Sequence, residues 1–209
     1  MAKERNGYPG GSRKHYIGTG RRPIEPAELE ELLVAVRARN PECEVLVLLA
    51  AECGLRRAEV QAVRVEHFLG QQKLLVPRGK GNVSRYTITT ARTRAALDIA
   101  MRLGIRDRVC TTGYSYLGML MNEWRGRAGL PSDITWHSLR HYFAMRCLRG
   151  GVLLNELSDL LGHRWLSSTA VYLHITEDRF IRACEALENP ASSNMGTGYL
   201  RVLEGGKGY

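Results

Sequence analysis

The longest apolar run of the chain, VLVLLAA at residues 45–51, constrains the fold more than any other stretch. It is far shorter than the roughly 18–20 apolar residues that a helix needs to span a bilayer. A helix that is hydrophobic all round has to be covered by other elements of a protein core. We therefore expect a central buried helix over residues 42–53, ended by Gly54.

The remaining periodicity predicts a mainly helical chain. Apolar residues at helical spacing predict helices over residues 26–38, 57–63, 91–103, 114–128, 138–149, 153–161, 167–173 and 177–187. Two stretches rich in β-branched residues, 72–77 and 83–89, flank the glycine-containing sequence RGKGN and predict a hairpin. The expected fold class is α+β: mainly α with a small antiparallel β-hairpin or sheet.

The charge of the chain points to a polyanionic partner. Lysine and arginine number 30 against 21 acidic residues, a formal charge of +9, and 44% of the residues are hydrophobic. Basic residues gather in three places, namely 1–25, 73–108 and 137–149. A charge of this sign, clustered around a hairpin and a helix start, is typical of a phosphate-backbone site. We see no secretory signal and no membrane partner, and expect a cytoplasmic, nucleoid-associated protein.

The sequence lacks the motifs that are typical of several classes of enzyme and metal-binding protein. The five cysteines have no C-x-x-C spacing, which argues against a disulfide framework and a structural zinc site. The sequence contains no H-E-x-x-H, Walker or G-x-S-x-G motif. We therefore expect no metal and no cofactor, and we do not favour a hydrolase, an NTPase or an oxidoreductase.

A set of basic and phenolic residues suits phosphoryl transfer, which needs positive clamps, a nucleophile and a proton donor. The candidate residues are Arg56, Lys80, His137, Arg140, His163 and Tyr172. Two arginines can grip one phosphate through their forked donors. A tyrosine can hold the phosphate as an ester, and a lysine can give a proton to the departing 5′-oxygen, which leaves as a hydroxyl. Such a site needs neither metal nor ATP.

The order of these residues, GLR, GKG, HSLRH, LGH and Tyr172, resembles the catalytic domain of the tyrosine recombinases, or phage integrases. The resemblance covers about residues 26–187. It implies that Tyr172 is the nucleophile that forms a 3′-phosphotyrosine, that Arg56 and Arg140 clamp the phosphate, and that Lys80 is the general acid. His137 and His163 would be supporting histidines, and Glu59 would orient the site. For contacts with DNA, we expect Arg78, Arg85, Arg92 and Arg164.

Each of these residues, taken singly, also allows a purely structural role. Arg56 could be a helix-terminal charge, Lys80 a solvated turn residue and Tyr172 a core residue. Two further functions are compatible with the same residues. A type IB topoisomerase uses the same tyrosine chemistry, although it usually carries lysine at the position of His137. A non-catalytic DNA-binding regulator could keep the fold and its basic face.

The resemblance also sets expectations for domains and partners. We expect a flexible basic arm at 1–25, the catalytic domain at 26–187, and a tail at 188–209 that docks on a neighbouring protomer. Most members of the family carry a further N-terminal helical domain that clamps DNA, which this sequence would lack. The implied partners are double-stranded DNA, a homotetramer on that DNA, and an accessory DNA-bending or directionality protein.

Overall fold

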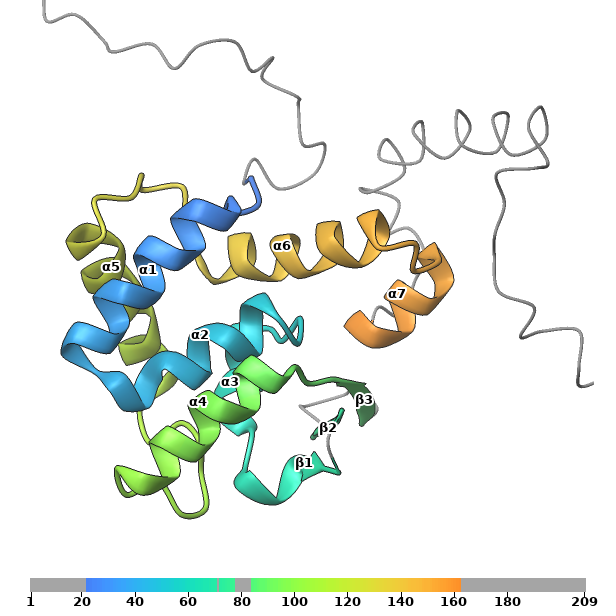
Figure 1. The fold of residues 1–209 in the computed structure, drawn as a ribbon, viewed down its shortest axis with the longest axis horizontal. Helices are drawn as coiled ribbons and strands as arrows, with labels where there is room; N and C mark the ends of the chain where they lie inside the picture. Colours follow the sequence, from blue (N-terminus) through green and yellow to red (C-terminus); the bar gives the residue numbers. More distant parts are fainter. Residues whose placement is uncertain (1–21, 71, 78–83, 163–209) are drawn as a thin grey trace, which may run out of the picture. The chain divides into compact units, whose positions relative to one another are not determined.

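The computed structural model describes residues 22–70, 72–77 and 84–162 (Figure 1). Its helices are α1 (Pro26–Arg39), α2 (Glu44–Ala51), α3 (Arg57–Ala62), α4 (Ala91–Arg102), α5 (Tyr114–Arg127), α6 (Trp136–Arg149) and α7 (Leu154–Leu161). Short 3₁₀ helices occupy Pro41–Cys43 and Val65–His67. The strands are β1 (Phe68–Leu69), β2 (Lys73–Val76) and β3 (Arg85–Ile88). This confirms the predicted fold class, whereas the helices expected over 167–173 and 177–187 lie outside the described residues.

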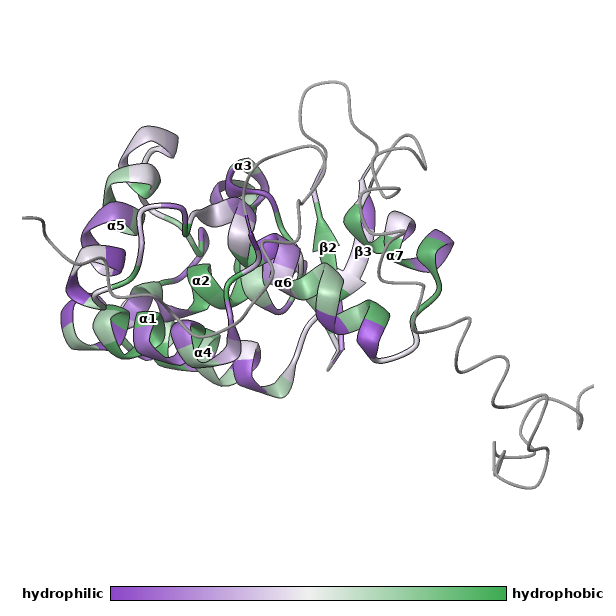
Figure 2. Cartoon of the chain, turned by 90° about the horizontal axis from the view of Figure 1, so that it is seen from above, coloured by the Kyte–Doolittle hydropathy of each residue, from purple (hydrophilic) through white to green (hydrophobic). Residues whose placement is uncertain are grey.

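Helix α2 forms the centre of the core, as the apolar run predicts. All eight of its residues are buried, and it packs against both α4 and α6. Figure 2 draws it in the green of hydrophobic residues. Helix α1, in contrast, buries only one stripe, at i, i+3, i+4 and i+7, formed by Leu29, Leu32, Leu33 and Val36. No helix of the described ranges is long and apolar enough to cross a bilayer.

The three strands form one antiparallel sheet in the order β1-β2-β3. Strand β2 pairs with β3 from Lys73↔Ile88 to Val76↔Arg85, which is the predicted hairpin. Strand β1 was not predicted, since its two residues are too few to show alternation. The sheet is tied to the end of α2 by Thr87, whose hydroxyl donates a hydrogen bond to the Cys53 carbonyl over 2.9 Å.

Gly54 ends the α2 segment in a conformation that other residues rarely adopt, with φ of +73°. A Cβ atom at this position would lie 2.5 Å from Cδ1 of Phe143 on α6. The missing side chain therefore lets α6 approach the turn closely. This turn leads directly into Arg56 and α3, so it positions the first candidate site residue.

Residues 22–25 lie against the helical body. Ile24 is 1% exposed, and its amide donates a hydrogen bond to the Ser138 carbonyl. Arg22 pairs with Glu28 over 2.6 Å and with Asp133 over 3.2 Å. These four residues were predicted to belong to the basic arm, whose remainder lies outside the described residues.

Candidate active site

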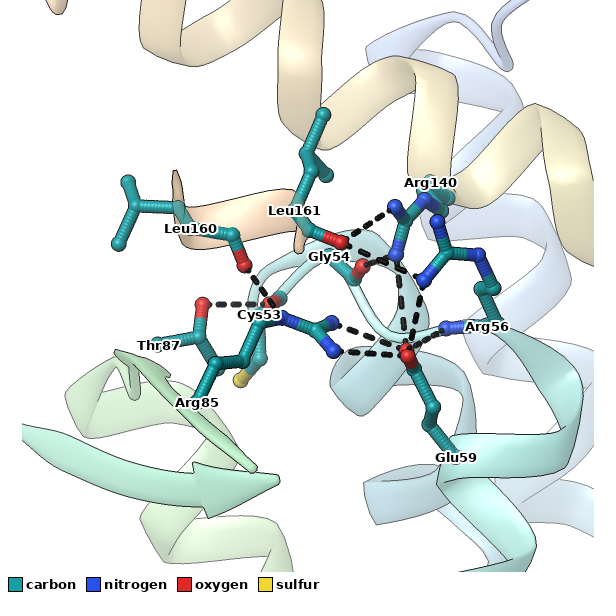
Figure 3. A network of polar contacts seen from close by, with 9 residues as sticks. All are labelled: Cys53, Gly54, Arg56, Glu59, Arg85, Thr87, Arg140, Leu160 and Leu161. Atoms are coloured by element: carbon teal, nitrogen blue, oxygen red, sulfur yellow. Dashed lines mark hydrogen bonds and ion pairs between the residues drawn. The ribbon is translucent and has the colours of Figure 1, made fainter. Parts of the chain in front are cut away.

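Glu59 lies at the centre of a network of arginines (Figure 3). It is the third residue of α3, where a carboxylate accepts from the amide that precedes the helix. Its Oε2 accepts from the Arg56 amide over 2.7 Å, and its Oε1 accepts from Arg56 Nη1 over 3.0 Å. One side chain thus both starts α3 and holds the Arg56 guanidinium.

Arg85 on β3 binds the same carboxylate from the opposite side. Its Nη1 and Nη2 donate to Oε1 and Oε2 of Glu59 over 2.7 and 2.9 Å, a bidentate pair. Its Nε donates to the Leu160 carbonyl over 2.8 Å. The side chain is only 11% exposed. We predicted a DNA contact here, but the structure directs this guanidinium into the protein, and its position does not support that prediction.

Arg140 on α6 completes the network. Its Nη1 donates to the Gly54 carbonyl over 2.6 Å and lies 3.5 Å from Glu59 Oε2. Its Nη2 donates to the Leu161 carbonyl over 2.7 Å, and Arg56 Nη1 donates to that same oxygen over 3.4 Å. The two arginines predicted to clamp one phosphate therefore already share one oxygen acceptor.

The electrostatics of the network favour an ionised Glu59. Burial alone would raise the pKa of this carboxyl, but the hydrogen bonds and charge of Arg85 oppose it. The Arg56 amide and the charge of Arg140 act in the same direction, and the pKa falls to about 2. Three guanidinium groups then surround one carboxylate, so the network keeps a net positive charge at neutral pH.

His137 lies on α6 one turn before Arg140, as its spacing predicts. It is exposed and lines a cavity of about 560 Å³ together with Arg56. The structure thus brings four predicted residues, Arg56, Glu59, His137 and Arg140, to one region.

Of the predicted residues that the structure describes, Arg92 lies apart from this region. Arg92 lies at the start of α4 and pairs with both carboxylate oxygens of Glu30 over 2.6 and 2.7 Å. Five more predicted residues lie outside the described part of the chain, namely Arg78, Lys80, His163, Arg164 and Tyr172. Within the described part, no group of three His, Cys, Asp or Glu side chains is placed to hold a metal ion.

The contribution of the α7 C-terminus was not predicted from the sequence. The carbonyls of Leu160 and Leu161 accept hydrogen bonds from three arginines. The sequence does not reveal which backbone carbonyls accept hydrogen bonds from side chains. Gly162 is an indirect signal for this contact. It ends α7 with φ of +62°, and a Cβ atom here would lie 2.7 Å from Cδ of Arg85. Glycine at the helix end thus makes room for Arg85.

The comparisons with known proteins all match this chain to integrases and recombinases. Residues 111–179 match the family described as the phage integrase family. The tyrosine recombinase XerC of Anoxybacillus flavithermus is 30% identical over 178 residues, which cover 74% of this chain and 58% of that protein. The chain spans about half the length of the curated relatives it matches.

Two solved structures share the fold. The catalytic domain of bacteriophage HP1 integrase aligns with a TM-score of 0.62 and 22% identity, over 82% of this chain and 99% of that one. The Tn1549 transposon integrase, solved in complex with circular intermediate DNA, aligns with a TM-score of 0.66 and 16% identity over 79% and 66%. The fold, the family match and the XerC relative together show that this chain belongs to the tyrosine recombinase, or phage integrase, family.

Proposed function

We propose that this chain carries the catalytic domain of a site-specific DNA recombinase that cuts and rejoins DNA through a 3′-phosphotyrosine. The observation that carries the proposal is the shared acceptor of Arg56 and Arg140, the Leu161 carbonyl. Two guanidinium groups that reach one oxygen are close enough together to bind one phosphate. The relatives are named recombinases, which does not favour a topoisomerase or a regulator.

The chemistry follows from the predicted roles. The Tyr172 hydroxyl oxygen attacks the phosphorus, and the bond from phosphorus to the 5′-oxygen breaks. His137 or His163 takes the tyrosine proton, and Lys80 gives a proton to the departing 5′-oxygen. Arg56 and Arg140 neutralise the charge on the non-bridging oxygens. A 5′-hydroxyl from a second duplex then attacks the phosphotyrosine and releases Tyr172, so the phosphodiester is conserved and no external energy source is needed.

Glu59 and Arg85 would act through the arginines. Glu59 contacts Arg56, Arg85 and Arg140, so it fixes the positions of both proposed clamps. A preorganised pair of donors loses little energy to reorganisation when charge develops on the phosphate. This supports the role in orienting the site that we predicted for Glu59.

The proposal extends to partners and assembly. The partner would be double-stranded DNA, since the Tn1549 integrase was solved with DNA. Exchange between two duplexes would use a homotetramer, with the tail at 188–209 docking on a neighbour. The arm at 1–25 would add grip on the DNA backbone, and an accessory DNA-bending or directionality protein would choose the outcome.

Covalent capture tests the proposal without knowledge of the DNA site. The protein is incubated in EDTA with a pool of nicked duplexes of randomised sequence, in which the cleaved end diffuses away and the adduct accumulates. We expect an adduct that resists detergent, that Tyr172→Phe abolishes, and that Tyr116→Phe preserves. Tyr116 is a matched control because its ring is 48% exposed on α5 and outside the arginine network.

The result also separates the alternatives. Sequencing the captured DNA gives the preferred site, on which strand exchange between two labelled duplexes is then measured. Absence of an adduct from the whole pool would refute the enzymatic proposal. An adduct with plasmid relaxation and no strand exchange would identify a topoisomerase-like activity instead.

A further inference from the structure

The residue after Arg56 is held in an unusual way. The Arg57 guanidinium carbon lies 3.7 Å from the centroid of the Tyr114 ring, a cation–π stack between α3 and the start of α5. Gly118, one turn along α5, makes room for it, since a Cβ atom there would lie 2.7 Å from Arg57 Nη1. The guanidinium is therefore fixed in a slot between an aromatic ring and a glycine.

The stack holds Arg57 without using its hydrogen-bond donors. Toward the described residues, the Arg57 guanidinium donates no hydrogen bond and pairs with no carboxylate, whereas Arg56 and Arg85 both donate to Glu59. Stacking uses the face of a guanidinium and leaves its edge donors available. Within the part of the chain that the structure describes, this arginine is oriented by Tyr114 and its donors stay available to a ligand.

The surrounding cavity is suited to an anion. Arg56, Arg57 and His137 line the same cavity of about 560 Å³, together with Ser115 and Asn122. Of the residues that the structure describes, none that lines this cavity carries a carboxylate. Two other surface pockets combine both signs of charge, one with Glu30, Glu31, Arg39 and Arg127 and the other with Arg94 and Asp98. The cavity lined by Arg56, Arg57 and His137 differs from these two pockets because its described lining includes arginines and no carboxylate.

We propose that this cavity binds the DNA phosphate next to the one held by Arg56 and Arg140, and that Arg57 is its ligand. The inference rests on the proposed function, because it takes DNA as the partner. Arg57 follows Arg56 directly and lines the same cavity, so it can contact the neighbouring phosphate on one strand. A guanidinium preset by Tyr114 loses little side-chain entropy on binding. The contact would fix the register of the strand rather than read its bases.

Binding to duplex DNA tests the proposal in the Tyr172→Phe protein, which cannot cleave. The affinity for a fluorescent 30-base-pair duplex of mixed sequence is measured by anisotropy over a range of salt concentrations. We expect Arg57→Ala to weaken binding about tenfold at low salt, as loss of a charge-assisted hydrogen bond does. The slope of log K against log salt should become shallower by about one, the signature of one lost phosphate contact.

Gly118→Ala provides a second variant that keeps Arg57 but displaces its guanidinium. We expect it to lower the affinity in the same direction, with no further loss when it is combined with Arg57→Ala. Gly126→Ala is its matched control, because Gly126 lies on the same helix and a Cβ atom there meets nothing within 4 Å. Arg127→Ala controls for charge at the far end of α5, about 20 Å from Tyr114.

The position of the phosphate is tested on the site obtained by covalent capture. A neutral methylphosphonate replaces the phosphate next to the cleaved one, on either side in turn. At one of these positions, binding should weaken for the protein with Arg57 and stay unchanged for Arg57→Ala. Sensitivity of both proteins at both positions would overturn the assignment.

The proposal is overturned if Arg57→Ala keeps the salt slope of the parent or matches Arg127→Ala. It is also overturned if Gly118→Ala and Gly126→Ala bind DNA equally. These failures differ from failure of the proposed function, in which the protein with Tyr172 forms no adduct and the Tyr172→Phe protein does not bind the duplex. Urea unfolding of each variant shows that the change in binding occurs in folded protein.

Discussion

Glu59→Gln removes the charge at the centre of the arginine network while keeping the shape of the side chain. The carboxylate accepts from Arg56 and Arg85 and lies beside Arg140. An amide cannot neutralise these guanidinium groups, and its NH₂ is a donor that faces other donors. The variant should therefore be less stable at neutral pH.

The magnitude follows from the pKa of Glu59, which falls from 4.5 to about 2 in the folded protein. At about 1.36 kcal/mol per pKa unit, ionisation of this group contributes about 3 kcal/mol to the free energy of unfolding at pH 7. The side chain is 13% exposed, so solvent screens the interaction little. Because the folded pKa is the lower one, this contribution is present above about pH 4.5 and is lost as the pH falls towards 2. It should decline to about 1 kcal/mol at pH 3.

Urea unfolding between pH 7 and pH 3 measures this contribution. Other carboxylates titrate in the same range, so the informative quantity is the difference between parent and Glu59→Gln at each pH. That difference should be about 3 kcal/mol at pH 7 and should shrink by about 2 kcal/mol at pH 3. Glu30→Gln is the matched control, since the exposed pair of Glu30 with Arg92 should contribute less than about 1 kcal/mol. A difference that is constant with pH would refute the electrostatic account of the network.

Two glycine positions give further predictions. Gly54→Ala should lower the free energy of unfolding by more than about 2 kcal/mol in urea titrations, because a positive φ and the contact with Phe143 both oppose a side chain. Gly162→Ala should slow formation of the covalent adduct more than Gly151→Ala does. Both glycines have positive φ, but only a side chain at 162 would meet Arg85.

Sequence periodicity was sufficient for most of the fold because each long helix buries a regular stripe or is buried entirely. The helix predicted over 26–38 is observed over Pro26–Arg39, and that predicted over 114–128 is observed over Tyr114–Arg127. The helix expected from residue 138 begins earlier, at Trp136. Ser138 lies in the first turn of this helix, where its hydroxyl accepts from the Thr135 amide over 3.2 Å.

The parts of the proposed site that consist of motif side chains could be predicted from the sequence, whereas the backbone acceptors could not. The family resemblance carried by GLR and HSLRH identified Arg56, Glu59 and Arg140, which the structure brings into contact. Nothing in the sequence indicated that the carbonyls of Leu160 and Leu161 would receive their donors. Contacts of this kind depend on how α7 packs against α6 and β3, which is a property of the fold.

Arg85 shows that a basic residue within a charged stretch can have its partners inside the protein. In strand β3 the apolar residues Tyr86 and Ile88 are 51% and 41% exposed, while Thr87 is 3% exposed. The alternation is thus the reverse of the usual one, in which apolar residues face the core. Polar residues can face inward here because the Cys53 carbonyl and the Glu59 carboxylate supply partners for Thr87 and Arg85.

Because Arg85 faces inward, it connects β3 to the rest of the proposed site. The strand that follows the hairpin turn is attached to Glu59 through Arg85, and Arg85 also binds the end of α7. Glu59 in turn holds Arg56. A change in the pairing of β3 would therefore move the Glu59 carboxylate, and with it the guanidinium groups of Arg56 and Arg140. The strand itself would not need to contact the phosphate. The charge that composition alone would assign to DNA binding is used at this position to hold the site together.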